Sequence, residues 1–308
     1  VGHIALETWI GAYGAEFQIF RERHPSRVPE DLGTMGYSGE EAMYVSQDVL
    51  QEAYGATGHT LQFYMSYNTS NYDAKKHFDK LTDLPAEDTT AMNPYAQWTG
   101  DLDGLVEVAG GYHAKCPDGR FWISPACRHN ASKCIPVVSN RLGWLVDTFM
   151  FWSAAYGMPT AIGISLSVQL HIDHFTNHRS LTYWYRPDVR FAHLDPQPII
   201  FPRHRASEWA QGNKRSMTQG SYIGKLVARE LCFQAFNAYE FVKNMEFDLS
   251  EVQTQLMKVA TENQSLEVVA CEQWTTSRVA LGQERFGPTG TAPGLLLQPR
   301  GSRFRLQM

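Results

Sequence analysis

The most apolar stretch of the chain is Gly143-Trp-Leu-Val-Asp-Thr-Phe-Met-Phe-Trp-Ser-Ala-Ala-Tyr-Gly-Met-Pro-Thr-Ala-Ile-Gly-Ile-Ser-Leu-Ser-Val168. Its length suits a membrane span, but Asp147 lies within it and Gly157-Met-Pro159 interrupts it. Before the break, apolar residues recur at helical spacing, and after it residues 160–167 are typical of a short buried strand. The stretch therefore predicts a helix, a turn and a strand, which is the repeating unit of an α/β protein.

Strands and helices are expected to alternate on both sides of this unit. After an expected strand at residues 3–9, residues 11–14 predict a turn and residues 16–23 a helix. A capping-box spacing at Ser38-Gly-Glu-Glu41 predicts a further helix start. Further strands are expected at residues 61–67 and 180–185. Further helices are expected at residues 73–81, 221–245 and 249–268, the last capped by Asp248. Beyond residue 282 the sequence is rich in Gly and Pro, which indicates a linker or tail.

The composition describes a globular chain that is large enough to bury a full core. The 308 residues are 43% hydrophobic and 19% charged, and the formal net charge is −5. Acidic and basic residues are mixed without long runs, so the sequence lacks the basic footprint of a nucleic-acid-binding protein or of one that binds anionic membranes. We therefore expect no nucleic-acid partner.

The sequence also lacks the motifs that usually indicate an enzyme. No Gly-x-Ser-x-Gly nucleophile elbow, no phosphate-binding loop and no dinucleotide-binding Gly-x-Gly-x-x-Gly is present. Carboxylates such as Glu7, Glu41 and Asp147 are more typical of caps and salt bridges than of an acid/base pair. We expect neither an enzyme nor a cofactor.

Three of the five cysteines crowd one short stretch. This stretch is rich in Pro, Gly and Lys and is typical of a loop closed by disulfides. A zinc knuckle is the alternative, but the close Cys-x-x-Cys pair that usually starts one is missing. The disulfide candidates are Cys116, Cys127, Cys134, Cys232 and Cys271. Three sequons would accept glycans in a eukaryotic secretory pathway, at Asn68, Asn130 and Asn263.

Three histidines lie at spacings of three and four, which places them on one face of a helix. These are His171, His174 and His178, with Asp173 between them. A metal site is possible there, but histidines near a helix C-terminus are favoured by the helix dipole and are usually solvated. We expect no metal.

Several aromatic residues fall where α/β folds place their ligands. Trp9, Trp144 and the run Tyr183-Trp-Tyr185 each lie at the end of an expected strand or beside a helix start. Facing aromatic rings attract quaternary ammonium groups, and the helix start at Gly143 offers backbone N–H groups for a carboxylate. Together they predict a site for a zwitterion, the alternative being that all of these rings pack in the core.

The order of these segments resembles the glycine betaine/proline-type substrate-binding proteins of ABC transporters, and more closely their eukaryotic extracellular relatives. The resemblance covers most of the chain. It rests on Ile4-Ala-Leu-Glu-Thr-Trp9, Leu32-Gly-Thr-Met-Gly-Tyr-Ser-Gly-Glu-Glu-Ala-Met-Tyr-Val45, Cys116-Pro-Asp-Gly, Ser124-Pro-Ala-Cys-Arg-His-Asn-Ala-Ser-Lys-Cys134, Leu142-Gly-Trp144 and Tyr183-Trp-Tyr-Arg-Pro-Asp188.

The resemblance implies a two-lobed α/β fold of the type II periplasmic-binding-protein kind, closing on its ligand like a hinge. Residues 1–108 and 187–282 would form lobe one with the C-terminal helices, residues 109–186 lobe two with the cysteine-bearing insert, and residues 283–308 a tail. The family normally has a strand and a helix before the Trp9 strand, so the first lobe is expected to be incomplete. The implied ligand-binding residues are Trp9, Trp144, Trp184, Tyr183, Tyr185, Gly143 and Asp188.

The function expected from this resemblance is an extracytoplasmic solute-binding module for a small zwitterion or quaternary amine such as glycine betaine. It would serve transport or sensing, with a membrane transporter or receptor segment as partner. Its expected location is extracellular, at the cell surface or in the lumen of the secretory pathway. Arg186 departs from this pattern, because a cation beside the aromatic run could repel a quaternary ammonium. The alternative is a structural component of an extracellular or membrane-associated assembly, built on a degenerate binding-protein fold.

Overall fold

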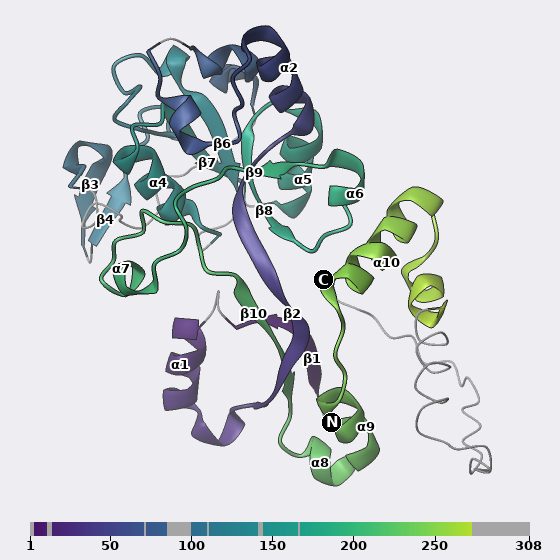
Figure 1. Cartoon of the computed structure of the whole chain (residues 1–308). Helices are drawn as coiled ribbons and strands as arrows, with labels where there is room; N and C mark the ends of the chain where they lie inside the picture. Colours follow the sequence, from purple (N-terminus) through teal and green to yellow (C-terminus); the bar gives the residue numbers. More distant parts are fainter. Residues whose placement is uncertain are drawn as a thin grey trace.

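The computed structural model describes residues 3–10, 14–70, 72–84, 100–109, 111–140, 144–165 and 167–272. Within them, a large mixed sheet carries helices on its faces, which confirms the expected α/β class (Figure 1). Its strands follow the order β1-β10-β2-β8-β6-β7-β5, with β9 also paired to β2, and β3 and β4 form a separate hairpin.

The strands are β1 (Ile4–Trp9), β2 (Glu30–Val45), β3 (Leu105–Val108), β4 (Gly111–Ala114), β5 (Trp122–Ile123), β6 (Ile135–Ser139), β7 (Thr160–Ile164), β8 (Leu181–Arg186), β9 (Gln197–Pro198) and β10 (Ser221–Val227). The helices are α1 (Gly14–Arg23), α2 (Gln47–Thr57), α4 (Val146–Ala155), α5 (Val168–Asn177), α6 (Phe191–Leu194), α7 (Ala206–Ala210), α8 (Leu231–Gln234), α9 (Phe236–Lys243) and α10 (Leu249–Glu262).

Strand β2 joins two parts of the molecule. Its first half pairs with β10 in a ribbon that also contains β1, and its second half pairs with β8 and β9 in the body (Figure 1). The body holds the parallel pairs β6–β7 and β6–β8, and every residue of β6 and β7 is buried. We call β1, β10 and the first half of β2 the ribbon. We call the second half of β2, together with β5 to β9 and the helices packed on them, the body.

The helix–turn–strand unit predicted at residues 144–167 is confirmed. Helix α4 is almost entirely buried, and β7 follows it after a turn at Gly157, whose φ of 61° suits glycine. Burial on all sides explains the continuous apolar sequence, because a helix without a solvent face needs no polar stripe. Among the described residues, no helix is long and apolar enough to cross a membrane.

Four secondary-structure predictions are wrong. Residues 38–41 lie within β2 and not at a helix start, because pairing with β10 and β8 on both sides overrides the local capping pattern. Residues 221–227 form β10 and not a helix, again because strands flank them on both sides. Residues 61–67 and 73–81 contain short 3-10 turns in place of a strand and a helix. The domain boundaries at residues 108 and 186 stay predictions.

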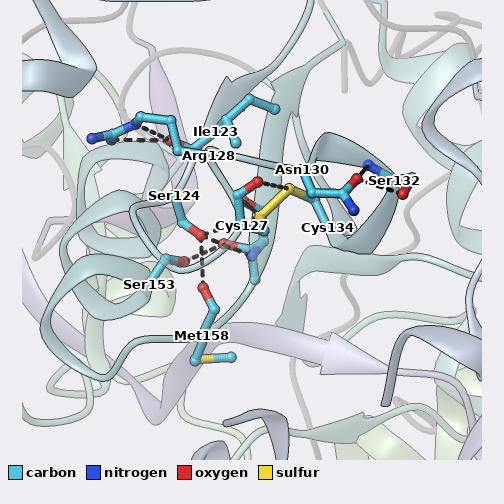
Figure 2. Close-up of a disulfide and its surroundings, with 10 residues drawn as sticks. Ile123, Ser124, Cys127, Arg128, Asn130, Ser132, Cys134, Ser153 and Met158 are labelled. Atoms are coloured by element: carbon cyan, nitrogen blue, oxygen red, sulfur yellow. Dashed lines mark hydrogen bonds between the residues drawn. A yellow bond between two sulfur atoms is a disulfide. The ribbon is translucent and has the colours of Figure 1, made fainter. Parts of the chain in front are cut away.

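The cysteine-rich insert is a loop closed by one disulfide. Figure 2 shows Cys127 bonded to Cys134, beside Ser124, whose hydroxyl donates a 2.8 Å hydrogen bond to the carbonyl of Met158. The prediction of a disulfide-stapled loop is confirmed for this pair. In the part of the chain that the structure describes, no disulfide includes the other three candidates, Cys116, Cys232 and Cys271.

Candidate functional site: an aromatic cluster between ribbon and body

Four of the predicted aromatic residues come together, although they come from three separate segments of the chain. The Trp9 ring, at the end of β1, lies edge-on to Tyr185 of β8, with ring centroids 5.3 Å apart. Trp144, just before α4, lies 6.3 Å from Tyr185 and 5.1 Å from Tyr183. We call Trp9, Trp144, Tyr183 and Tyr185 the aromatic cluster. Trp9, Trp144 and Tyr185 are half-buried, whereas Tyr183 is buried.

The location follows from the topology of the sheet. Trp144 follows the carboxyl end of β6, and Tyr185 lies near the carboxyl end of β8, which is parallel to β6. In open α/β sheets, ligands bind beyond these ends of the strands. The hydroxyl of Ser139, the last residue of β6, donates a 2.7 Å hydrogen bond to the carbonyl of Trp144 and fixes the backbone there.

Trp9 reaches the cluster because β2 has a glycine beneath it. A Cβ atom at Gly39 would collide with the six-membered ring of Trp9 and would lie 3.0 Å from Cδ1 of Ile223. Ile223 is also the residue that pairs with Trp9 across β1 and β10. The absence of a side chain at position 39 therefore allows the indole to lie against β2.

Trp184 lies mainly on the side of α5, although its ring also stacks on Tyr185 of the aromatic cluster, with centroids 5.7 Å apart. Successive residues of a strand face opposite sides of the sheet, and Trp184 is 2% exposed on the side of α5. There it stacks between His171, at 5.0 Å, and Phe175, at 4.7 Å. The structure thus places this tryptophan in the core, and we do not retain it as a ligand wall.

The other two predicted binding residues have different outcomes. Gly143 lies outside the described residues. Asp188 lies in the turn after β8, where Nη1 of Arg190 donates to both of its carboxylate oxygens at 2.9 and 3.1 Å. Desolvation first, and then the charge of Asp188, raise the pKa of the Tyr185 phenol. The charge of Asp188 therefore acts on Tyr185, although Arg190 is already the ion-pair partner of Asp188.

Sequence reasoning missed two residues beneath the cluster, Gly39 and Glu41. Glu41 pairs directly with Tyr185 across β2 and β8. Its carboxylate accepts hydrogen bonds from the hydroxyls of Tyr183 and Ser221, the latter at 3.2 Å. Neither residue belongs to a recognisable motif, and only the register of three strands identifies them.

The three histidines lie on α5 and directly after it. No group of three or more His, Cys, Asp or Glu residues able to hold a metal occurs in the part of the chain that the structure describes. The expectation that they are solvated is wrong for His171 and His174, which are fully buried in α5. The Nε2 atom of His171 donates to the carbonyl of Tyr183 at 2.9 Å, so this ring supports the cluster from behind.

A hollow of about 380 Å³ lies elsewhere, between the start of α2 and the end of α5. It contains no residue of the aromatic cluster. Its basic side chains Arg179 and His178 are engaged, Arg179 with Glu52 at 2.6 Å and His178 with Asp79 at 3.3 Å. We assign no function to it.

The three sequons differ in their surroundings. Asn130 and Ser132 are exposed, and the Ser132 hydroxyl donates to Oδ1 of Asn130 at 2.6 Å (Figure 2). Asn68 instead donates from Nδ2 to the carbonyl of Tyr156 at 3.3 Å. Asn263 ends α10 in a left-handed conformation. Glycosylation at these positions stays a prediction.

No family model matches the sequence, and no curated protein matches it. Solved structures do resemble it. The glycine betaine/L-proline-binding protein of an ABC transporter from Borrelia burgdorferi is 12% identical, with a TM-score of 0.40 over 87% of this chain and 72% of that one. Lactococcal OpuAC, in complex with glycine betaine, is 9% identical, with a TM-score of 0.43 over 91% and 76% of the two chains.

An ABC-transporter choline-binding protein in complex with choline is 10% identical, with a TM-score of 0.44 over 90% of this chain and 72% of that one. These structures belong to the class of proteins that the sequence resembles.

Proposed function

We propose that the protein is a non-enzymatic, extracytoplasmic module that binds a small solute carrying a quaternary ammonium group, for transport or sensing. The observation that carries this proposal is the meeting of Trp9, Trp144 and Tyr185 at the junction of ribbon and body. The faces of these rings are negative, and each desolvated cation–ring contact contributes about 0.5 to 2 kcal/mol. Three partly exposed rings from separate elements can surround such a group.

The placement of the walls suits a module that closes on its ligand. Trp9 belongs to the ribbon, whereas Trp144 and Tyr185 belong to the body. A solute held between them would contact both parts at once and would favour the arrangement in which they are close. A transporter or receptor partner would then distinguish the solute-bound arrangement of ribbon and body from the solute-free one.

The disulfide favours the extracytoplasmic location. Disulfides persist in oxidising compartments and are rare in the cytosol. The Cys127–Cys134 bond joins residues that are 4% and 0% exposed, beneath a loop whose polar residues face outwards. A location outside the cytoplasm is therefore the environment in which this loop keeps its structure.

The test is calorimetric titration of the purified chain with glycine betaine, choline and proline. We expect binding of a quaternary amine at about micromolar Kd, and its loss in Trp9→Ala. Trp184→Phe is the matched control, because this ring is buried and Phe keeps the stacking on His171 and Phe175. Absence of heat with all three solutes would favour the structural role.

A further inference from the structure

We propose that Glu41 makes the aromatic cluster selective for a ligand with a net positive charge, such as a quaternary ammonium alcohol, over a zwitterion. This inference rests on the proposed function, since it concerns the ligand of the same site. It rests on the register of β2 against β8 and on the charges around the cluster.

The register places the Glu41 side chain among the rings. Glu41 lies opposite Tyr185, and Met43 lies opposite Tyr183. Residues directly opposite each other share a face, with Cβ atoms about 5 Å apart. Gly39, two residues earlier on the same face, lies beneath Trp9. The carboxylate thus has Tyr185 beside it and Trp9 next along the strand.

Hydroxyl groups hold this carboxylate in place without neutralising it. One oxygen accepts from Tyr183 and the other from Ser221 at 3.2 Å, while the Thr218 hydroxyl donates to the Glu41 backbone carbonyl at 2.9 Å. Across the described ranges, no Lys, Arg or His forms an ion pair with Glu41. The negative charge of Glu41 can therefore interact with a cationic ligand.

The neighbouring cations do not cancel this negative potential. Arg190 neutralises Asp188, and the guanidinium of Arg186 lies 4.5 Å from the centre of the Phe191 ring. Because Arg186 pairs with Glu40 in the register, its side chain belongs to the opposite face of the sheet from Glu41. The cation that the sequence places beside the aromatic run therefore does not oppose a cationic ligand.

Glu7 is a second acidic group on the ribbon side. It lies two residues before Trp9, at an irregularity in the β1–β10 pairing, with a φ of 57°. Desolvation first, and then the charge of Asp188, raise the pKa of Glu7. The second of these causes is the response expected of a carboxylate close to another one.

Such an environment distinguishes the two ligand classes. The ammonium group of either ligand is attracted to the rings and to Glu41. In a zwitterion, the carboxylate a few ångströms away is repelled by the same side chain and loses its hydration on binding. A ligand with a hydroxyl in place of the carboxylate avoids both costs.

The experiment is titration of the full chain with choline, glycine betaine and tetramethylammonium, for the wild type, Glu41→Gln and Glu40→Gln. In the wild type we expect choline to bind at least about tenfold more tightly than glycine betaine. Glu41→Gln should remove most of this preference. Glu40→Gln should keep it, because this neighbouring carboxylate faces the other side of the sheet.

A second measurement needs no variant. The uncharged choline analogue 3,3-dimethylbutan-1-ol has the same shape, so we expect it to bind the wild type at least about tenfold more weakly than choline. Glycine betaine binding as tightly as choline, or an unchanged preference in Glu41→Gln, would overturn the inference and leave the proposed function intact. If tetramethylammonium, choline and glycine betaine all fail to bind, both this inference and the proposed function are wrong.

Discussion

At the scale of single residues, Gly39 decides how closely the Trp9 ring approaches β2. Because a methyl group there would collide with Trp9, we expect Gly39→Ala to displace the indole and weaken solute binding about tenfold. Titration with choline and the intrinsic tryptophan fluorescence would measure this. Gly55→Ala is the control, since its Cβ on α2 meets no atom within 4 Å. Full affinity in Gly39→Ala would contradict the role of Trp9.

His171 makes the stability of the folded chain depend on pH. Burial, the largest cause, lowers the pKa of His171 from 6.5 to about 4, although the hydrogen bond to Tyr183 opposes the shift. The unfolded chain therefore takes up the proton first, and stability falls as the pH decreases from about 6.5 to about 4. The total loss from this residue is about 3 kcal/mol.

Urea unfolding of the wild type and His171→Gln at pH 7 and pH 4.5 measures this contribution. The free energy of unfolding should fall less with pH in the variant than in the wild type, by about 2 to 3 kcal/mol. His129→Gln, at an exposed position, should behave like the wild type. Equal pH dependence in all three proteins would mean that another group controls it.

The aromatic residues of the site were predictable from sequence, whereas the residues beneath them were not. Trp9, Trp144 and Tyr185 lie at strand ends or beside a helix start, and these positions can be found without knowing which strands are neighbours. Trp184 shows the limit, because only the contacts in the structure show that its ring is buried against α5. Gly39 and Glu41 depend on pairing between residues far apart in the chain.

At the scale of elements, β10 shows why local spacing failed. Its apolar residues recur at three and four, and the expected period of two is hidden because Gly224 and the charged Lys225 are both buried. Strands on both sides satisfy its backbone, so tertiary pairing decides its conformation. By contrast, α4, β7 and the Asp248 cap of α10 follow from local sequence, and their predictions are confirmed.

Lys225 links β10 to α9. It is 1% exposed, and its Nζ atom donates to the carbonyls of Lys243 and Met245, both at 2.9 Å, at the C-terminal end of α9. A cation there interacts favourably with the helix dipole and satisfies carbonyls that the helix leaves unpaired. We expect Lys225→Met to lower the free energy of unfolding by about 2 kcal/mol.

Chemical denaturation would measure this loss, with Lys243→Met as the matched control. Lys243 is half exposed and its amine is 3.7 Å from Glu240, so its removal should cost at most about 0.5 kcal/mol. A Lys225→Met protein as stable as the wild type would show that packing alone holds α9 on the ribbon.

At the scale of the whole molecule, the ribbon and the body differ in how much core supports them. The largest hydrophobic cluster lies in the body and includes β6, β7 and α4. The cluster under the ribbon is small, with Val227, Leu231 and Val242 as its buried members. Ile4 to Glu7 of β1 are exposed. Segments with few buried apolar contacts open more readily than a core, so the ribbon should open before the body.

Hydrogen exchange followed by mass spectrometry tests this difference and its link to function. Without ligand, amides of β1 should exchange at least about 100-fold faster than those of β6. Because Trp9 and Tyr185 would hold the solute together, choline at 100 times its Kd should stabilise the closed arrangement by about 2.7 kcal/mol and slow exchange in β1 about 100-fold. Trp9→Ala should remove this protection and leave β6 unchanged. If choline binds and β1 in the wild type exchanges as fast as without it, the ribbon does not form a wall of the site, and the ligand contacts the body alone.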